Sequence, residues 1–280
     1  MANALAPGAT SDVATVVAIT TDPLLAETSE ALRTLRARSA VRTILITLGG
    51  DAQPPVDRSD DATTIHGLLP QFVNNAVAAL RLSSLPSLAW WRRPETDLLE
   101  DIARLVDRIV LDVPAPAASW DQARRLRELT SFSDLRWTRL TRWRSLMAQF
   151  FDLPDVGSAA DAYTTLSISA RDTDAARLFA GWMRTQFPRG SHLAVSITPS
   201  DTGEELISSI TLQGERQELG LRLLANRTCV ETVVRRDEQP DAVRVVPLGN
   251  TSHAALLSEE MRVRSRDLAF EGALEGVGAL

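Results

Sequence analysis

Arginine and tryptophan are concentrated in one stretch of this 280-residue chain, DLRWTRLTRWRSLM at 134–147. Two tryptophans and four arginines fall between positions 136 and 144. An arginine side chain can hold a carboxylate or a phosphate through two parallel hydrogen bonds, or stack on an indole ring. The stretch therefore suits a recognition surface. It equally suits a buried helix whose arginines form ion pairs within the chain, and residue chemistry leaves both interpretations open.

A single helix is expected to position this stretch, from Asp134 to Phe151. Its apolar residues recur at helical spacing and are Trp137, Leu140, Trp143, Met147 and Phe150. Ser133 or Asp134 can cap its start by accepting a hydrogen bond from a free backbone N–H. Arg139 and Arg142 fall largely on other faces of this helix, which makes them the candidates for contact with a partner.

A second group of candidates, Trp90, Trp91, Arg92 and Arg93, closes the apolar run LPSLAWW at 85–91. That run is one of five predicted strands, which cover 13–20, 41–48, 62–69, 85–91 and 108–113 and are separated by helical patterns. Alternating strands and helices predict a parallel sheet, here a Rossmann-like doubly wound domain over residues 1–152. Ligands of such domains bind outside the carboxyl ends of the strands. The four residues are therefore candidate site residues, unless the tryptophans only cover the sheet edge.

The segment LPDVGS at 153–158 is the predicted domain boundary. Beyond it, an alternating strand at 163–170 and an amphipathic helix at 172–187 precede a series of short alternating runs. These runs predict consecutive antiparallel strands at 192–197, 205–212, 218–224, 228–234 and 242–246. Two helices, at 250–262 and 266–274, follow. The fold class expected is α/β, with an α+β domain carrying an antiparallel sheet over residues 159–280.

Composition excludes several classes of function. The formal net charge of −6 and the isoelectric point of about 5.2 disfavour nucleic acid as a partner, because backbone binding needs a basic surface. The chain contains no lysine, so Schiff-base and P-loop chemistry are excluded. Cys229 is the single cysteine and permits neither an internal disulfide nor a multi-cysteine zinc site. No signal peptide or membrane-spanning run is evident, and we expect a cytoplasmic protein without a membrane partner.

No catalytic set can be assembled from the motifs. The first strand is followed by TTDP in place of the GxGxxG of dinucleotide-binding domains. His66, His192 and His253 are widely separated, and neither HExxH nor GxSxG occurs. The sequence therefore predicts no catalytic residue, no metal and no cofactor, while leaving an uncharacterised enzyme that uses the Rossmann-like cleft as an alternative.

Several segments in both halves resemble one family. These are LPSLAWW at 85–91, DRIVLD at 107–112, DLRWTRLTRWRSLMAQFFD at 134–152, RLFAGWMRTQF at 177–187 and LLSEEMRVRSRDLAFEGAL at 256–274. In this order they resemble the glucose-6-phosphate dehydrogenase assembly protein family OpcA. The Asp-Leu-x-Trp-x-Arg-Leu-Thr-x-Trp-Arg pattern is long and unusual, which makes the resemblance specific.

The resemblance implies a non-catalytic allosteric activator of a bacterial enzyme. Such a protein binds glucose-6-phosphate dehydrogenase, promotes its active oligomer, and so controls the oxidative pentose phosphate pathway and NADPH supply. In cyanobacterial relatives the system is associated with thioredoxin-linked control, which the lone Cys229 cannot support through an internal disulfide.

Tryptophan and arginine are frequent interface hot spots. The partner-binding residues expected are therefore Trp90, Trp91, Arg92, Arg93, Arg139 and Arg142. Trp137 and Trp143 are expected to be buried and to form the structural core of the predicted helix from Asp134 to Phe151, called the motif helix below. The alternative to an assembly factor is a sensor that binds a small anionic ligand, a sugar phosphate or a nucleotide.

Overall fold

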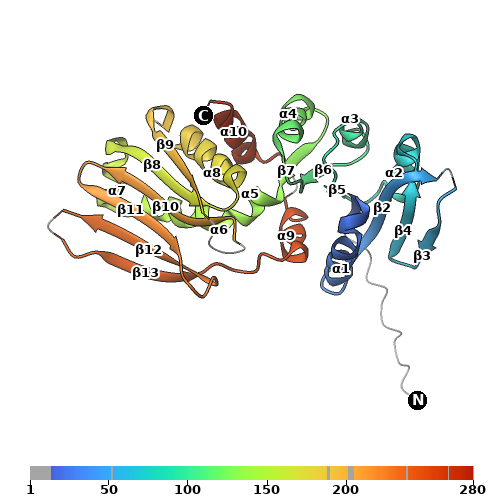
Figure 1. Cartoon of the computed structure of the whole chain (residues 1–280), viewed down its shortest axis with the longest axis horizontal. Coiled ribbons are helices and arrows are strands. Elements are labelled where there is room, and N and C mark those ends of the chain that lie inside the picture. Colours follow the sequence, from blue (N-terminus) through green and yellow to red (C-terminus); the bar gives the residue numbers. More distant parts are fainter. Residues whose placement is uncertain are drawn as a thin grey trace, which may run out of the picture. The chain divides into compact units, whose positions relative to one another are not determined.

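The computed structural model describes residues 14–51, 53–187, 190–200, 205–237, 239–263 and 265–279. Contacts divide the chain into two compact units (Figure 1). The first contains the chain up to Phe132 together with Ser252–Arg266, and the second contains Ser133–Thr251 together with the C-terminal segment from Asp267.

The first unit is built on a seven-stranded sheet with the order β3-β4-β2-β1-β5-β6-β7. Its strands are β1 (Ala14–Thr20), β2 (Val41–Asp51), β3 (Val56–Arg58), β4 (Ala62–Leu68), β5 (Ser87–Trp91), β6 (Arg108–Leu111) and β7 (Ser131–Asp134). Strands β4, β2, β1, β5 and β6 are parallel, and the short edge strand β3 runs antiparallel to β4. This order confirms the predicted Rossmann-like doubly wound sheet.

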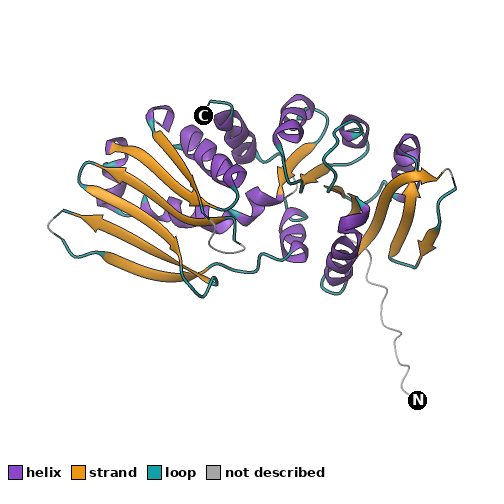
Figure 2. Ribbon diagram, viewed as in Figure 1, coloured by secondary structure: helices purple, strands orange, loops and turns teal. Residues whose placement is uncertain are grey.

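The helical elements of this unit connect these strands, except for α9 (Figure 2). They are the 3₁₀ turns η1 (Asp22–Leu24) and η2 (Pro70–Phe72) and the helices α1 (Leu25–Arg36), α2 (Val73–Leu80), α3 (Leu99–Ala103), α4 (Ala117–Leu126) and α9 (His253–Glu260). Strands β1 and β5 are buried along their whole length because helices cover both sheet faces, which explains their continuous apolar sequences. Helix α9 comes from the far end of the chain and packs on α1.

The second unit is built on a six-stranded sheet with the order β13-β12-β11-β10-β8-β9. Its strands are β8 (Tyr163–Ala170), β9 (Ala194–Pro199), β10 (Ile207–Gly214), β11 (Gln217–Leu223), β12 (Cys229–Arg236) and β13 (Ala242–Pro247). Its helical elements are α5 (Leu135–Arg139), α6 (Thr141–Phe150), α7 (Pro154–Ser158), η3 (Ala160–Ala162), α8 (Thr173–Gln186), η4 (Gly190–His192) and α10 (Leu268–Val277).

One feature of the second sheet differs from the prediction of consecutive antiparallel strands. Strand β9 pairs in parallel with β8, and β10 pairs antiparallel with the other side of β8. The reason is helix α8, which carries the chain across the sheet between β8 and β9, as parallel pairing requires. The remaining pairs, from β10 to β13, are antiparallel as predicted.

The division between the units also differs from the predicted boundary at 153–158. It falls within β7, and residues 154–158 form α7 with Pro154 in its first turn. Helices α5 and α6 pack on α8 and β11, so they belong to the second unit. Sequence composition could not show this, because it does not reveal which sheet a helix packs against.

Helices α8 and α10 approach each other at two glycines. A Cβ atom at Gly181 would lie 2.8 Å from the backbone nitrogen of Val277, and one at Gly276 would lie 2.7 Å from the Cα of Gly181. Both contacts are with backbone atoms, and moving these would distort a helix. The two residues must therefore lack a side chain for the helices to pack.

We expect Gly181→Ala to lower the free energy of unfolding by about 1–3 kcal/mol, because the added methyl overpacks the α8–α10 contact. Urea-induced unfolding followed by circular dichroism measures this. Gly220→Ala is the matched control, since a Cβ there would meet nothing closer than the Cβ of Val233 at 3.8 Å. Equal stabilities of the two variants would contradict the assignment of a close helix contact.

Tyr163, the only tyrosine of the chain, lies in an aromatic cluster of the second unit. Its ring packs edge-on against Phe151 and Phe187, and its hydroxyl donates to Oε1 of Gln217 at 2.8 Å. Burial raises the pKa of the Tyr163 hydroxyl to about 12.

Absorbance at the tyrosinate band should therefore titrate near pH 12, against about pH 10 for an exposed tyrosine. Between these values the unfolded chain loses the tyrosine proton and the folded chain keeps it, so stability falls as pH rises. A spectrophotometric titration is unambiguous because no other tyrosine contributes. A midpoint near pH 10 in protein shown by circular dichroism to be folded would contradict the burial of this hydroxyl.

Candidate functional site

Arg92 occupies the carboxyl edge of the parallel sheet, directly after β5. Its Nη2 donates to Oε2 of Glu27 at 2.8 Å, and its Nη1 donates to Oγ1 of Thr28 at 2.7 Å. Its Nε lies 2.9 Å from Oδ2 of Asp112, the residue that follows β6. The side chain is only 5% exposed. This guanidinium is therefore held by carboxylates of its own chain.

The same Oδ2 of Asp112 receives further contacts. Trp90 Nε1 donates to it at 3.2 Å, and Nε2 of His253 lies 3.5 Å away. The other ring nitrogen of His253 lies 3.1 Å from Oε1 of Glu27. The rings of Trp90 and His253 lie 5.4 Å apart, and the guanidinium of Arg92 lies 4.6 Å from the centre of the Trp90 ring. A compact network of ion pairs and rings thus fills this edge.

Arg93 is held in a similar way. Its Nε donates to Oε2 of Glu95, and its Nη1 lies near Oδ1 of Asp97, both at 3.1 Å. Its guanidinium lies 5.5 Å from the ring centre of Trp91. Arg93 is buried, with 8% of its surface exposed.

The expectation that Trp90, Trp91, Arg92 and Arg93 contact a partner is corrected by these positions. Both tryptophans have no exposed surface at all, because β5 lies in the middle of a sheet covered on both faces. Neither indole can touch another protein, and both arginines are engaged within their own unit. The interpretation that the tryptophans cover the sheet was the better one.

These residues do not fit a dinucleotide bound in the usual way. That mode needs a glycine-rich turn after β1 and a helix N-terminus aimed at the pyrophosphate. Here β1 leads through Thr21 into η1, which begins with Asp22 and Pro23, and Glu27 lies in the first turn of α1. Carboxylates at these positions would repel a pyrophosphate.

The arginine- and tryptophan-rich stretch lies in the second unit and forms two helices, where one was predicted. Residues 131–134 are strand β7, α5 follows, and α6 begins at Thr141. The backbone nitrogen of Leu140 bonds to the carbonyls of both Arg136 and Trp137, which tightens the last turn of α5 and separates the helices. Asp134 caps α5 by accepting from the backbone N–H of Arg136 at 2.8 Å, as predicted.

Trp137 and Trp143 are buried, as predicted, with 1% and 3% of their surface exposed. Trp137 Nε1 donates to Oδ2 of Asp267 at 2.8 Å, and the guanidinium of Arg144 stacks 3.4 Å from the ring centre. Asp267 also caps α10 by accepting from the backbone N–H of Phe270. Trp137 therefore joins the motif helices to the C-terminal helix.

Arg136 is an internal structural arginine. Its Nε donates to Oδ2 of Asp172 at 2.7 Å, and its Nη1 lies 3.6 Å from Oδ1 of Asp134. Burial lowers the pKa of Arg136, but the carboxylates of Asp134 and Asp172 outweigh it, so the pKa lies above the usual value. Burial also raises the pKa of the nearby Asp174 carboxyl, with the Asp172 charge adding to the effect.

Arg139 and Arg142 are the candidate contact residues that keep partly exposed side chains. Nε of Arg142 donates to the carbonyl of Pro247, at the end of β13, at 3.1 Å. Both residues therefore remain candidates for contact with a partner.

Sequence reasoning missed several members of these networks. Glu27, Asp112 and His253 complete the cluster around Arg92, and Glu260 holds Arg108. Asp112 had a usable signal, since it ends a strand at the same sheet edge as Arg92. His253 and Glu260 had none, because α9 returns to the first unit from a distant part of the sequence.

Comparison with known proteins gives a family match over the second half of the chain. Residues 130–274, more than half of the chain, match the family described as the C-terminal domain of the glucose-6-phosphate dehydrogenase subunit. Two cyanobacterial proteins, each provisionally named OxPP cycle protein OpcA, match over 123 residues: that of Nostoc punctiforme at 25% identity and that of Synechocystis at 26%. Each match covers 41% of this chain and 26% of the relative, so the chain matches about a quarter of these relatives' length.

Solved structures share the fold at low sequence identity. An aldose-aldose oxidoreductase from Caulobacter crescentus superposes with a TM-score of 0.55 at 10% identity, covering 94% of both chains. A super-repressor mutant of Gal80p from Saccharomyces cerevisiae gives 0.52 at 10% identity, covering 89% of this chain and 83% of its own. This likeness establishes the α/β fold alone.

The motif helices α5 and α6, the sheet they pack on and most of the C-terminal helix α10 lie within residues 130–274. The chain therefore belongs to the OpcA family, whose C-terminal domain is described as that of a glucose-6-phosphate dehydrogenase subunit.

Proposed function

We propose that this chain is a non-catalytic partner of glucose-6-phosphate dehydrogenase that promotes the active oligomer of the enzyme and raises its activity. The observation that carries the proposal is the match of residues 130–274 to a domain described as part of a subunit of that dehydrogenase. The names of the two cyanobacterial relatives point to the same area of metabolism.

The carboxyl edge of the first sheet supports a non-catalytic role. The side chains that would lie nearest a nucleotide there are engaged with one another, from Glu27 through Arg92 to Asp112. The fold does not decide the matter, because structures described as an oxidoreductase and as a repressor both share it.

The mechanism proposed is thermodynamic linkage. A protein that binds the active oligomer of an enzyme better than its inactive form shifts the equilibrium by the difference in binding free energy. A tenfold shift needs a difference of only about 1.4 kcal/mol. Arg139 and Arg142 are the proposed contacts, since they combine partial exposure with a residue type common at interface hot spots.

The test is to mix the purified chain with the dehydrogenase of the same organism over a range of ratios. Size-exclusion chromatography should show co-elution, and dehydrogenase activity should rise with the amount of chain and then saturate. The chain alone, given glucose 6-phosphate and NADP, should show no turnover. Absence of both association and activation at every ratio would refute the proposal, and turnover by the chain alone would make it an enzyme.

The alternative role as a sensor of sugar phosphates or nucleotides has lost its main support. It relied on Arg92 and Arg93 being available at the sheet edge, and both are paired with carboxylates. Calorimetry with glucose 6-phosphate, 6-phosphogluconate and NADP would still distinguish the two roles, because a module that binds only protein should give no binding heat with any of them.

A further inference from the structure

Strand β9 forms one edge of the second sheet, and its outer side has no neighbouring strand among the described residues (Figure 1). The backbone N–H of Ser200, directly after β9, bonds to the carbonyl of Ala170 in β8. Because backbone groups point to alternate sides along a strand, this bond implies that those of Val195 and Ile197 point away from β8. The N–H and C=O groups of these two residues are therefore available to pair with a further strand.

A cavity of about 600 Å³ lies along this edge, between β9 and the helices α8 and α10. Its floor includes the apolar side chains of Val195, Ile197 and Val277. On the neighbouring strand, their partners Leu166 and Ile168 are 0% and 1% exposed, whereas Val195 and Ile197 are only half-buried. The helices thus cover β8 and leave the apolar side of β9 open. We call this cavity the β9 groove.

Two arginines line the β9 groove from α8. Arg177 and Arg184 lie about two helical turns, or roughly 10 Å, apart. Arg177 is 56% exposed, and its nearest carboxylate among the described residues, that of Asp174, is 3.7 Å away. Arg184 donates through Nη1 to the carbonyl of Ala279. Its Nη2 makes no hydrogen bond among the described residues and is not enclosed, so a ligand in the groove could reach it.

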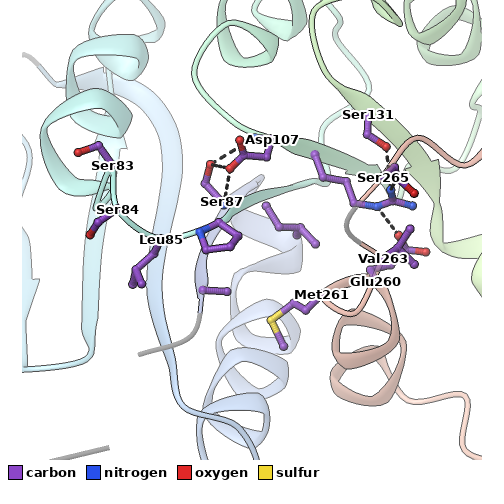
Figure 3. A pocket seen from close by; sticks show the side chains of 14 residues that line it. Ser83, Ser84, Leu85, Ser87, Asp107, Ser131, Glu260, Met261, Val263 and Ser265 are labelled. Atoms are coloured by element: carbon purple, nitrogen blue, oxygen red, sulfur yellow. Dashed lines mark hydrogen bonds and ion pairs between the residues drawn. The ribbon is translucent and has the colours of Figure 1, made fainter. Parts of the chain in front are cut away.

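The arginine that lines a cavity of the first unit is placed differently (Figure 3). Arg108 is 5% exposed, and its guanidinium is held by Glu260 and by the hydroxyl of Ser131, both at 2.7 Å. Arg177 and Arg184 have no such close carboxylate among the described residues. The β9 groove therefore offers cations to a ligand, beside an unpaired strand edge.

An extended peptide fits these features. A strand paired with β9 would carry side chains over the groove at every second position, about 6.6 Å apart. Two acidic side chains separated by one such position would lie about 13 Å apart, which the long side chains of Arg177 and Arg184 can span. The side chain between them would then lie over Val195 and Ile197.

We propose that the β9 groove binds an extended segment of a partner protein, which adds a strand to β9 and places acidic side chains on Arg177 and Arg184 with an apolar side chain between them. Backbone pairing would provide affinity, and the arginines would select the sequence. The groove uses neither Arg139 nor Arg142, so it is a second interaction surface. It can be tested with the chain alone.

The experiment measures the binding of two fluorescein-labelled heptapeptides to the full chain by fluorescence anisotropy. The acidic probe is Thr-Glu-Thr-Val-Thr-Glu-Thr, and the basic probe carries lysine in place of both glutamates. The acidic probe should bind saturably, with a Kd on the order of 100 μM. The basic probe should bind at least about tenfold more weakly, because it meets two arginines.

Two variants of the chain place the binding in the groove. Arg177→Glu should weaken binding of the acidic probe at least about tenfold, whereas Arg125→Glu, at an exposed arginine of α4, is the matched control and should leave it unchanged. Ile197→Pro removes an N–H that points away from the sheet, a change that an edge strand tolerates, and should also weaken binding at least about tenfold. Ile197→Val keeps that N–H and should bind nearly as well as the unaltered chain.

The proposal is overturned if the acidic probe does not bind up to about 2 mM, if the basic probe binds equally well, or if neither Arg177→Glu nor Ile197→Pro weakens binding. Circular dichroism shows whether the proline variant is folded, and Arg177→Glu decides if it is not. A dimer of the chain that Ile197→Pro dissociates, seen by light scattering, would make this edge a contact between two copies and would also overturn the proposal. The dehydrogenase takes no part in these measurements, so their failure is separate from a failure of the proposed function.

Discussion

Glu260→Ala is expected to lower the free energy of unfolding of the first unit by about 3–5 kcal/mol, because it leaves the charge of Arg108 buried without its carboxylate. The two side chains are 5% and 4% exposed, and their Nε and Oε2 atoms lie 2.7 Å apart. Their positions are 152 residues apart in sequence, so the pair also fastens α9 to the first sheet. Urea-induced unfolding monitored by tryptophan fluorescence measures the change.

Glu100→Ala is the matched control for this experiment. Glu100 pairs with Arg104 at 2.6 Å one helical turn away, but both side chains are 57% exposed. Water screens such a pair, and its loss should cost no more than about 0.5 kcal/mol.

A double variant shows how much of the stability lost in Glu260→Ala comes from the unpaired buried charge and how much from lost packing. Arg108→Met combined with Glu260→Leu removes both charges and keeps apolar volume, so it should recover much of the stability lost in Glu260→Ala. If Glu260→Ala costs no more than Glu100→Ala, the buried pair does not contribute as described.

Reversing both charges with Arg139→Glu and Arg142→Glu should weaken association with the dehydrogenase by roughly 100-fold, if these residues contact it as proposed. Both side chains are partly exposed, but Arg142 also donates to the carbonyl of Pro247, so circular dichroism must first show that the double variant is folded. Binding is followed by interferometry, and activation by the rate of NADPH formation. Activation should fall as binding is lost, because the chain can shift the equilibrium of the enzyme only while it is bound.

The control for the charge reversal is Arg177→Glu, an exposed arginine on α8 that lies outside the motif helices. It changes the net charge in the same direction and should affect association little. Retention of full binding by the double variant would place the contact surface elsewhere on the chain. Retention of binding with loss of activation would show that these arginines distinguish the two states of the enzyme without providing affinity.

The sequence predicted the type and order of most elements because they depend on local patterns. Runs such as VATVVAIT and RTILITL are β-branched and apolar without alternation, which indicates strands buried on both faces, and β1 and β2 lie in the middle of the parallel sheet. The period of apolar residues in 172–187 likewise predicted α8, and Asp172 caps it. Edge strand β3 and strand β7 were missed, since each is short and has little apolar pattern.

The candidate site was predicted only in part. Trp137 and Trp143 were placed correctly in the core, because they share the helical spacing of their apolar neighbours. Arg92 and Arg93 were placed at the correct edge of the sheet but assigned the wrong environment. Because they are arginines, they were expected to be exposed and to bind a partner protein. Only the fold places Glu27, Asp112 and Glu95 beside them.

The sequence by itself determined the doubly wound sheet, the second sheet domain and the family, because each depends on residue periodicity or on contiguous motifs. Tertiary structure decided which arginines are engaged, which sheet the motif helices pack on, and that α9 returns to the first unit. The physical reason is that an ion pair depends on distance in space. Glu260 and Arg108 are 152 positions apart in sequence, so no local sequence pattern could predict their contact.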